Sequence, residues 1–416
     1  MSGPLTGIRV VDLSSVVSGP LCAATLADQG ADVIKVEAPA GDMTRHSRTA
    51  IGDFPPMFVA CNRGKRAIVL DLKNPKGADV LWRLIDTADV LIQNFRPGTM
   101  DRLGFGEPAV RQRNKRIVYL SISGVGEAGP YASKRVYDPL IQALSGLADI
   151  QSDPLTGRPK MVRTLVADKA TAFFAAQAVT AALFHQQRTG EGQHVRLSML
   201  DTMLAYLWPE GMNDYAVVNQ EASPAPTSPH DMIFEASDGF LTVGANSDKE
   251  WKGLCEGLDR PDWLSDPRFA TQALRSRNRQ ARLSMLEDVL RQNTVAHWLD
   301  VLDRADVPCA PVLRRKDIAD HPQVVASQSI ETIDHPGVGN IRLARPAARF
   351  EKSPAGIKGA APYLGEHTRV VHGDLGSPAV GIAGVSGEGA RGCREDRACT
   401  RRWRGSRGGP RGAEGG

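Results

Sequence analysis

Cysteine is scarce in the 416-residue sequence, and the spacing of the six cysteines gives them no common role. None form a Cys-x-x-Cys pair and no histidine cluster accompanies them, so buried thiols are expected and no metal ligands are predicted. Hydrophobic runs of the roughly 18 residues that would span a membrane are also missing. The N-terminus lacks the basic and apolar stretches of a secretory signal. The sequence therefore predicts a cytoplasmic protein without a membrane partner.

A strong charge of either sign is absent as well. The formal net charge is +4, and most of it comes from residues 371–416, which hold eight arginines against five acidic residues. The preceding 370 residues are almost neutral and give no electrostatic reason to expect nucleic-acid binding.

Alternating strand and helix patterns dominate the first third of the chain. Ile8–Leu13 and Asp32–Glu37 have the character of buried strands, and Leu21–Gln29 between them has the pattern of a helix that ends at Gly30. The alternation continues through expected strands at 67–71, 90–94 and 117–123 and an expected helix at 75–88. Repeated βαβ units predict an α/β fold, with a Rossmann-like large domain whose parallel sheet has helices on both faces.

The stretch Leu-Val-Ala-Asp168-Lys-Ala-Thr-Ala-Phe-Phe places a carboxylate where a short apolar run gives way to a long helix pattern. Asp168 could simply be the N-cap of that helix, because aspartate is among the preferred capping residues. It could instead be a carboxylate nucleophile, which the positive end of the helix dipole would keep ionised even when partly buried. Both roles need the same position, so the local pattern does not choose between them.

The surrounding motifs do choose, because they resemble the central segment of the class III CoA-transferases, a family that includes alpha-methylacyl-CoA racemases. The chain has Gly-Arg-Pro before Asp168, then Ala-Ala-Leu-Phe, Arg-Thr-Gly190-Glu-Gly-Gln and Val-Arg-Leu-Ser-Met-Leu-Asp201. The resemblance extends from about Pro4 to about Thr368. It implies that Asp168 is the catalytic nucleophile and that coenzyme A thioesters are substrates, with no tightly bound cofactor.

By the same resemblance, coenzyme A is expected along loops that follow predicted strands. The family's coenzyme contacts fall on Val17, Ser18, Leu70, Lys73, Asn94, Phe95, Arg96, Arg102, Arg135 and Tyr137. The loop Ser14–Pro20 leads into a helix N-terminus, where backbone N–H groups can receive phosphate, or it is a plain strand-to-helix turn. The basic run Cys61-Asn-Arg63-Gly-Lys65-Arg66 could neutralise the coenzyme's phosphates, or it is a solvated loop.

The run Gly124-Val-Gly-Glu-Ala-Gly129 has the form of a dinucleotide-binding fingerprint, but we do not expect it to act as one. That fingerprint belongs to the first βα turn and a helix begins inside it, whereas Pro130 follows the last glycine here. The resemblance instead makes this run the glycine loop of the transferases.

Tyr137 bears on the choice between acyl transfer and racemisation. The family's racemases have a histidine base at this position and a glutamate base after a Val-Gly pair, where this chain has Val243-Gly-Ala-Asn-Ser. A tyrosine with the ordinary pKa of about 10 is a poor base at neutral pH, and Tyr137 could also be a packed aromatic with a hydrogen-bonded hydroxyl. We therefore expect transfer of coenzyme A from an acyl-CoA to a free carboxylic acid through an aspartyl anhydride and an aspartyl-CoA thioester. An acyl-CoA racemase or isomerase and a non-catalytic CoA-binding protein are the alternatives.

Composition and the resemblance together predict the domain order. Residues 1–225 form the large CoA-binding domain, and a linker rich in proline, serine and alanine precedes a smaller α+β domain over 226–328, with a hairpin turn at Asp238-Gly239. Residues 329–370 match the family's return to the large domain. The Gly- and Arg-rich segment 371–416 is expected to be a disordered extension, from a reading-frame slip or as an RNA-binding tail. The resemblance also implies an interlocked homodimer.

Overall fold

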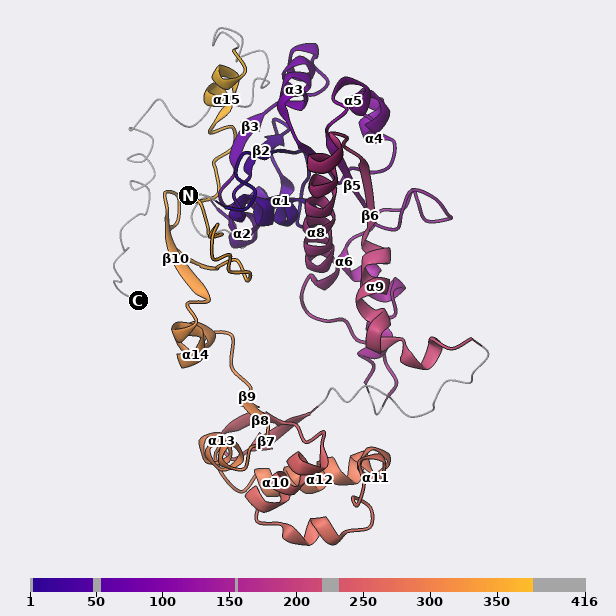
Figure 1. Cartoon of the computed structure of the whole chain (residues 1–416), viewed down its shortest axis with the longest axis vertical. Helices are drawn as coiled ribbons and strands as arrows, with labels where there is room; N and C mark the ends of the chain where they lie inside the picture. The colour runs from indigo at the N-terminus through magenta and orange to yellow at the C-terminus, as the bar shows by residue number, and fades with distance from the viewer. Residues whose placement is uncertain (1–2, 48–53, 154–155, 219–231, 377–416) are drawn as a thin grey trace, which may run out of the picture. The chain divides into compact units, whose positions relative to one another are not determined.

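The computed structural model describes residues 3–47, 54–153, 156–218 and 232–376 (Figure 1). It separates into two units, one comprising Met1–Leu207 with Ile330–Gly416 and the other Trp208–Ser329. The domain boundary predicted at residues 225 and 226 lies in the segment 219–231, outside the described residues. Within the described ranges, no helix combines the length and the apolar character needed to cross a bilayer.

A six-stranded parallel sheet forms the larger unit's framework, in the order β3-β2-β1-β4-β5-β6. Its strands are β1 Arg9–Asp12, β2 Asp32–Glu37, β3 Arg66–Val69, β4 Val90–Gln93, β5 Val118–Ser123 and β6 His194–Ser198. Most are near-continuous apolar runs, because a parallel sheet is covered by helices on both faces. The predicted α/β fold with a parallel sheet is confirmed.

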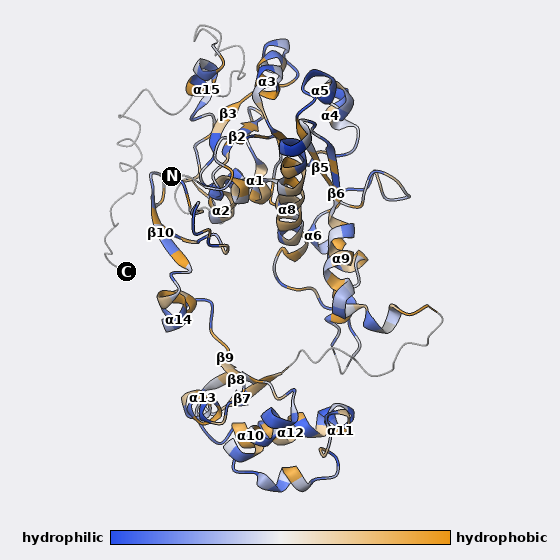
Figure 2. Cartoon of the chain, viewed as in Figure 1, coloured by the Kyte–Doolittle hydropathy of each residue, from blue (hydrophilic) through white to orange (hydrophobic). Residues whose placement is uncertain are grey.

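Neighbouring residues of one strand divide between two hydrophobic cores. Val10 packs in a core with α1 (Ser18–Asp28) and α8 (Val166–Thr189), whereas Val11 packs in a core with α3 (Pro75–Thr87). Successive side chains of a strand point to opposite faces, so the two valines necessarily contribute to different cores. Figure 2 shows that the helices differ in hydropathy: α1, which packs in one of these cores, is coloured mainly hydrophobic, and α5 (Glu107–Arg113) is coloured mainly hydrophilic.

Further helices lie before residue 218, and a β-hairpin and one helix lie after residue 329. Before residue 218 they are α2 Pro56–Asn62, α4 Thr99–Arg102, α6 Asp138–Leu144, α7 Leu147–Ile150, α9 Met199–Gly211 and the 3-10 turns Met43–His46 and Asn213–Tyr215. After residue 329 they are the antiparallel strands β10 Ile330–His335 and β11 Gly339–Ala344, and helix α15 Thr368–Asp374. Val371 of α15 is buried, and Asp374 pairs with Arg66 at 2.7 Å. The first residues of the segment predicted to be disordered are therefore helical, and residues 377–416 lie outside the described residues.

The smaller unit combines a three-stranded antiparallel sheet with short helices. The strands are β7 Ile233–Ala236, β8 Gly239–Val243 and β9 Cys309–Pro311, and the helices are α10 Asp248–Gly257, α11 Gln272–Arg277, α12 Arg279–Leu290, α13 Val295–Arg304, α14 Pro322–Ala326 and the 3-10 turns Pro261–Ser265 and Ile318–Asp320. Ala236 pairs with Gly239 across the β7–β8 turn, as the Asp-Gly signal predicts. Three tryptophans contribute to its core, Trp251, Trp263 and Trp298.

Candidate active site

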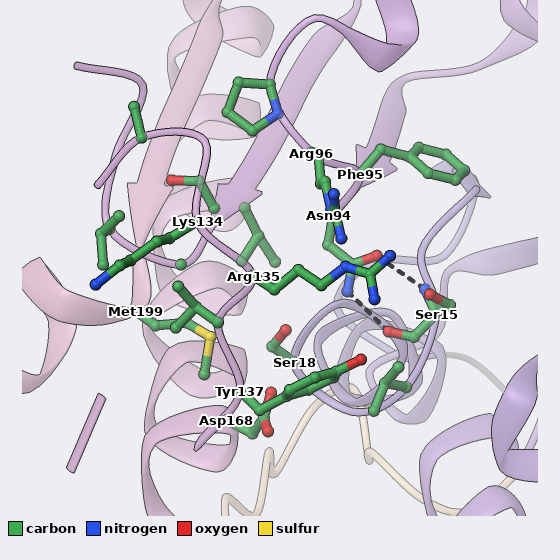
Figure 3. Close-up of a pocket in the computed structure, with 18 of the residues that line it drawn as sticks. Ser15, Ser18, Asn94, Phe95, Arg96, Lys134, Arg135, Tyr137, Asp168 and Met199 are labelled. Carbon is green, nitrogen blue, oxygen red and sulfur yellow. Dashed lines mark hydrogen bonds between the residues drawn. The ribbon is translucent and has the colours of Figure 1, made fainter. Parts of the chain in front are cut away.

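The order of the parallel strands reverses at β1, whose neighbours are β2 on one side and β4 on the other. The loops that leave two such strands diverge, which opens a crevice at the carboxyl edge of the sheet. A pocket of about 310 Å³ lies there, lined by the loops after β1 and β4, residues 122–125, residues 132–137 and the start of α8. All of these residues belong to the larger unit (Figure 3).

The loop after β1 has a strained conformation where it borders the pocket. Val16 has a φ of 72°, a left-handed value that costs a non-glycine residue on the order of 1–3 kcal/mol. Its N–H donates to the Asp42 carboxylate at 3.2 Å. The adjacent Ser15 exchanges two backbone hydrogen bonds with the Asn94 side chain, at 2.9 and 2.7 Å (Figure 3). Because Asn94 directly follows β4, its amide joins the two loops that border the crevice.

Two buried ion pairs hold this loop in place. Lys35 on β2 is fully buried and donates to the Ser14 carbonyl and to Asp42, both at 3.1 Å. Lys65 is also buried and donates to Asp12, the last residue of β1, at 2.7 Å. Each buried ammonium has a carboxylate partner, so removal of one partner would leave an uncompensated charge.

The basic run at residues 63–66 is committed to ion pairs of this kind. Arg63 pairs with Asp28 at 2.5 Å and Arg66 with Asp32 at 2.6 Å, while Lys65 is bound to Asp12. The expectation that these cations neutralise coenzyme phosphates stays a prediction, and carboxylates of the protein already offset their charges. The solvated-loop alternative is wrong, because Lys65 is buried and the sequence does not reveal which carboxylates lie beside these side chains.

Asp168 lines the pocket from the third position of α8. Leu165 occupies the N-cap position and gives no side-chain cap, so the interpretation of Asp168 as the N-cap is wrong. The first amides of α8 are instead bound by Asp138, whose Oδ2 accepts from Ala167 N at 2.7 Å and from Asp168 N at 3.1 Å. The Asp168 carboxylate is left to face the pocket, near Ser18 at the start of α1 (Figure 3).

The surroundings raise the pKa of the Asp168 carboxyl to about 6. Burial is the largest cause, since only 9% of the residue is exposed, and the charge of Asp138 adds to it. Hydrogen bonds from the hydroxyl and the backbone N–H of Ser18 act in the opposite direction. Asp168 is therefore largely ionised at neutral pH, as expected, but its carboxylate is more basic than that of an ordinary aspartate.

Three cations are among the side chains that line the pocket together with Asp168. Arg96 follows β4, and Lys134 and Arg135 precede α6, while no second carboxylate is among the described lining residues. Figure 3 shows Arg135 extending toward the loop at Ser15, with Tyr137 beside Asp168. Tyr137 is 55% exposed, so the alternative of a packed aromatic is wrong. This charge distribution attracts an anionic ligand to the pocket.

The sequence matches a model of a known protein family over most of its length. The model described as CoA-transferase family III matches residues 5–368. The chain belongs to CoA-transferase family III. It is accordingly an enzyme of the CoA-transferase class, as the motifs around Asp168 predict.

Relatives of this CoA-transferase match it over most of its length. It is 31% identical over 371 residues to a succinyl-CoA:glutarate CoA-transferase of Homo sapiens, covering 88% of this chain and 84% of the relative. It is 36% identical over 332 residues to an acetyl-CoA:oxalate CoA-transferase of Acetobacter aceti, covering 78% and 84%. A crystal structure of a CAIB/BAIF family protein from Brucella suis matches with a TM-score of 0.79 and 32% identity, covering 90% of this chain and 100% of the other.

The pocket of the CoA-transferase brings together most of the residues that the sequence singles out. These are Ser18, Asn94, Phe95, Arg96, Arg135, Tyr137 and Asp168. Val17 and Leu70 are buried, and Lys73 and Arg102 lie outside the lining. The coenzyme contacts of all ten residues expected from the sequence stay predictions. Sequence reasoning missed Lys134 and the role of Asp138. The Asp138-Pro139 pair marks the start of α6, but it gives no sign of the contact between Asp138 and α8.

A serine, a histidine and a carboxylate also meet elsewhere in the CoA-transferase, without forming a hydrolase site. Ser121 Oγ lies 2.8 Å from His194 Nε2, and His194 Nδ1 lies 3.7 Å from Glu107 Oε2. Ser121 is only 7% exposed and its hydroxyl oxygen accepts from Gln93, and the second distance exceeds that of a hydrogen bond. In the part of the chain that the structure describes, no group of three His, Cys, Asp or Glu is arranged to hold a metal ion.

Proposed function

We propose that this CoA-transferase moves coenzyme A from an acyl-CoA donor to a free carboxylic acid, with Asp168 as the covalent carrier. The observation that supports the proposal is a single carboxylate of raised pKa in a pocket whose other charged side chains are cations. A carboxylate that burial makes more basic, yet that is still ionised at neutral pH, suits a nucleophile.

Covalent catalysis divides a transfer that would otherwise be slow, because a thiolate does not attack an unactivated carboxylate. The Asp168 carboxylate attacks the carbonyl carbon of the donor thioester, and the C–S bond breaks. Coenzyme A leaves as a thiolate, and the acyl group stays on Asp168 as a mixed anhydride. The thiolate then attacks the Asp168 carbonyl, which gives an aspartyl-CoA thioester and releases the donor acid as a carboxylate. The acceptor carboxylate repeats the two steps in reverse, forming the new acyl-CoA and restoring Asp168.

Each attack creates an oxyanion, which needs hydrogen-bond donors in a site that excludes water. The glycine loop after β5 lines the pocket at Gly124 and Val125, and we assign the oxyanion role to its backbone N–H groups. Arg96, Lys134 and Arg135 supply positive charge for the phosphates and carboxylates of the substrates. The remaining coenzyme contacts expected from the sequence belong to the same proposal.

We further propose that one of the exchanged acids is a dicarboxylic acid. The two relatives named above carry glutarate and oxalate in their names. A dicarboxylate keeps one free carboxylate when the other is bound to coenzyme A, and the three pocket cations provide partners for that charge.

A racemase or isomerase is less well supported by the pocket. Proton transfer on both faces of an alpha carbon requires two suitable bases, and neither a histidine nor a second carboxylate is among the described lining residues. Deuterium incorporation at the alpha carbon without acyl exchange would favour that alternative, and coenzyme binding without turnover would favour a non-catalytic protein.

We also propose that the enzyme is a homodimer. Large aromatic side chains are exposed along α8 and α9, including Phe173 at 56%, Phe184 at 65% and Tyr206 at 55%. Exposed aromatic surfaces are typical of protein interfaces, and a second copy of the chain is the partner that the family resemblance implies. A cytoplasmic location and the absence of a tightly bound cofactor also stay predictions.

The substitution Asp168→Asn tests the covalent carrier. It removes the nucleophile while keeping the size of the side chain, so transfer from succinyl-CoA or acetyl-CoA to a panel of carboxylic acids should fall by about 10³-fold or more. Asp149→Asn, at an exposed aspartate of the same unit, is the matched control and should keep its activity. Mass spectrometry of quenched wild-type enzyme should find a hydroxylamine-sensitive adduct on the peptide that contains Asp168. Full activity in Asp168→Asn, or turnover without that adduct, would refute the proposal.

A further inference from the structure

Helix α6 places a second carboxylate, Asp138, against the first turn of α8. Asp138 is 1% exposed, and no ion pair found among the described residues includes it. Its Oδ2 accepts from the backbone N–H groups of Ala167 and Asp168, and its Oδ1 accepts from Gln142 Nε2 at 2.6 Å. The buried charge is thus balanced by peptide dipoles at the positive end of α8 and by one side-chain amide.

Gln142, one turn further along α6, extends this contact to the segment before α8. Its Oε1 accepts from Val162 N at 2.9 Å, and its Nε2 lies 3.2 Å from the Val162 carbonyl oxygen and 3.3 Å from that of Thr164. Two side chains of α6 therefore fix the backbone from residue 162 to the residue proposed as the nucleophile.

We propose that Asp138 is a positioning residue of the transfer reaction, which holds the first turn of α8 and, through its negative charge, makes Asp168 a stronger nucleophile. The inference rests on the proposed role of Asp168. Asp138 does not line the pocket, and both of its oxygens are engaged, so it does not meet the substrate. A like charge nearby favours the protonated form of a carboxylate, and a more basic oxygen is the better nucleophile once ionised.

The other groups around Asp168 do not duplicate this effect. Helix α1 contributes Ser18, which donates hydrogen bonds and acts against the shift. The segment before α6 contributes Lys134, Arg135 and Tyr137, and the loop after β4 contributes Arg96. Strands β5 and β6 also pack against α8, and their ionisable residues are Tyr119, His194 and Arg196. His194 comes shortly after the C-terminal end of α8, whereas Asp168 lies at its N-terminal end. Among the charged groups, Asp138 is the one whose charge raises the pKa of Asp168.

The substitution Asp138→Asn tests the inference through the pH dependence of transfer. Removal of the charge should move the acidic limb of kcat/KM to lower pH by on the order of one unit. The rate above the limb should fall about tenfold or more, because the nucleophile is less basic and its helix turn is less firmly held. The carboxyl ¹³C signal of Asp168, assigned by its loss in Asp168→Asn, should titrate at lower pH by the same amount in protein without substrate. That signal does not depend on turnover, so failure of this inference can be told apart from failure of the proposed function.

Gln142→Ala is the matched control, because it weakens the contact between α6 and the segment before α8 and keeps the charge of Asp138. It should lower the rate without moving the limb. If Asp168 titrates alike in wild type and in Asp138→Asn, the proposal is overturned and Asp138 has only a structural role. If Asp138→Asn does not fold, Asp138→Glu replaces it: the retained charge should keep the limb in place while the displaced carboxylate lowers the rate. A limb that drops by a unit in Asp138→Glu contradicts the inference.

Discussion

At the scale of single residues, burial of Asp168 makes the folded protein less stable at neutral pH. The pKa of the carboxyl rises from 3.8 to about 6 on folding, so the folded state holds its proton more tightly than the unfolded chain does. Below a pH of about 4 both states are protonated and the group has no effect. As the pH rises through the window from about 4 to 6, the unfolded chain ionises first, and the folded state loses about 1–3 kcal/mol relative to it.

The variant Asp168→Asn is therefore expected to be more stable than wild type at pH 7, by about 1–3 kcal/mol, because the amide has no charge to desolvate. Urea unfolding from pH 4 to 8 measures this difference, which should shrink toward zero near pH 4. Asp149→Asn, at an exposed position, should show no such pH dependence. A variant less stable than wild type at pH 7 would contradict the assignment of a destabilised carboxylate.

Local sequence patterns predict only some of the properties of Asp168. Asp168 could be singled out because a carboxylate at the start of a long helix is a recognisable pattern and its flanking motifs resemble a known family. Its cap could not be predicted, because the carboxylate that binds the first amides of α8 comes from Asp138 on another helix. The pKa depends on the same tertiary neighbours and on burial, which no local pattern contains.

At the scale of elements, the conformation of the loop after β1 depends on two buried charged residues outside the loop, Asp42 and Lys35. Its left-handed residue, Val16, is held by a carboxylate, and that carboxylate also pairs with the fully buried Lys35. A strained conformation persists only when its surroundings determine it strongly. The shape of the pocket edge therefore depends on the charge of Asp42, a residue outside the pocket lining.

The substitution Asp42→Ala is expected to destabilise the protein by about 3–5 kcal/mol, because it leaves the Lys35 ammonium buried without its partner. It should also weaken binding of coenzyme A, since Val16 loses the acceptor of its N–H. Urea unfolding and calorimetric titration with coenzyme A measure the two effects. Asp86→Ala is the matched control: Asp86 pairs with Arg113 on the surface at 2.6 Å, and such a pair is worth about 1 kcal/mol or less. Equal losses in the two variants would show that the buried pair has no special role.

Elements themselves were largely predictable, and their partners were not. The strand expected at 32–37 is β2, and the helix expected at 75–88 is α3, ending at Thr87, because apolar periodicity is a local property. Lys35 within β2 gave no sign of the carboxylate that would neutralise it. The ion-pair partners of the basic run at 63–66 could not be predicted for the same reason, since Asp12, Asp28 and Asp32 come from earlier parts of the chain.

At the scale of the whole molecule, the strand order connects the fold with the site. The sequence predicts a parallel sheet from repeated βαβ units, but the order β3-β2-β1-β4-β5-β6 depends on which strands pair. That order puts the loops after β1 and β4 at the reversal point, where the pocket opens. Residues from Ser15 to Met199 thereby meet in one crevice, which explains why the candidate residues are scattered along the sequence.

The proposed dimer would cover the exposed aromatic side chains of α8, and this can be tested on the whole molecule. If a second copy of the chain covers it, as proposed, Phe173→Glu places a charge in an apolar interface and should weaken dimerisation by about tenfold or more. Sedimentation velocity over a range of micromolar concentrations measures the change. Val370→Glu on α15 is the matched control, because Val370 is 57% exposed, against 56% for Phe173, and α15 lies outside the proposed interface. Wild-type protein that stays monomeric throughout, or a Phe173→Glu variant that associates as wild type does, would exclude this face as the interface. A dimer that weakens with Phe173→Glu alone would instead show that α8 combines two roles, with the proposed nucleophile in its first turn and subunit contact along its exposed side.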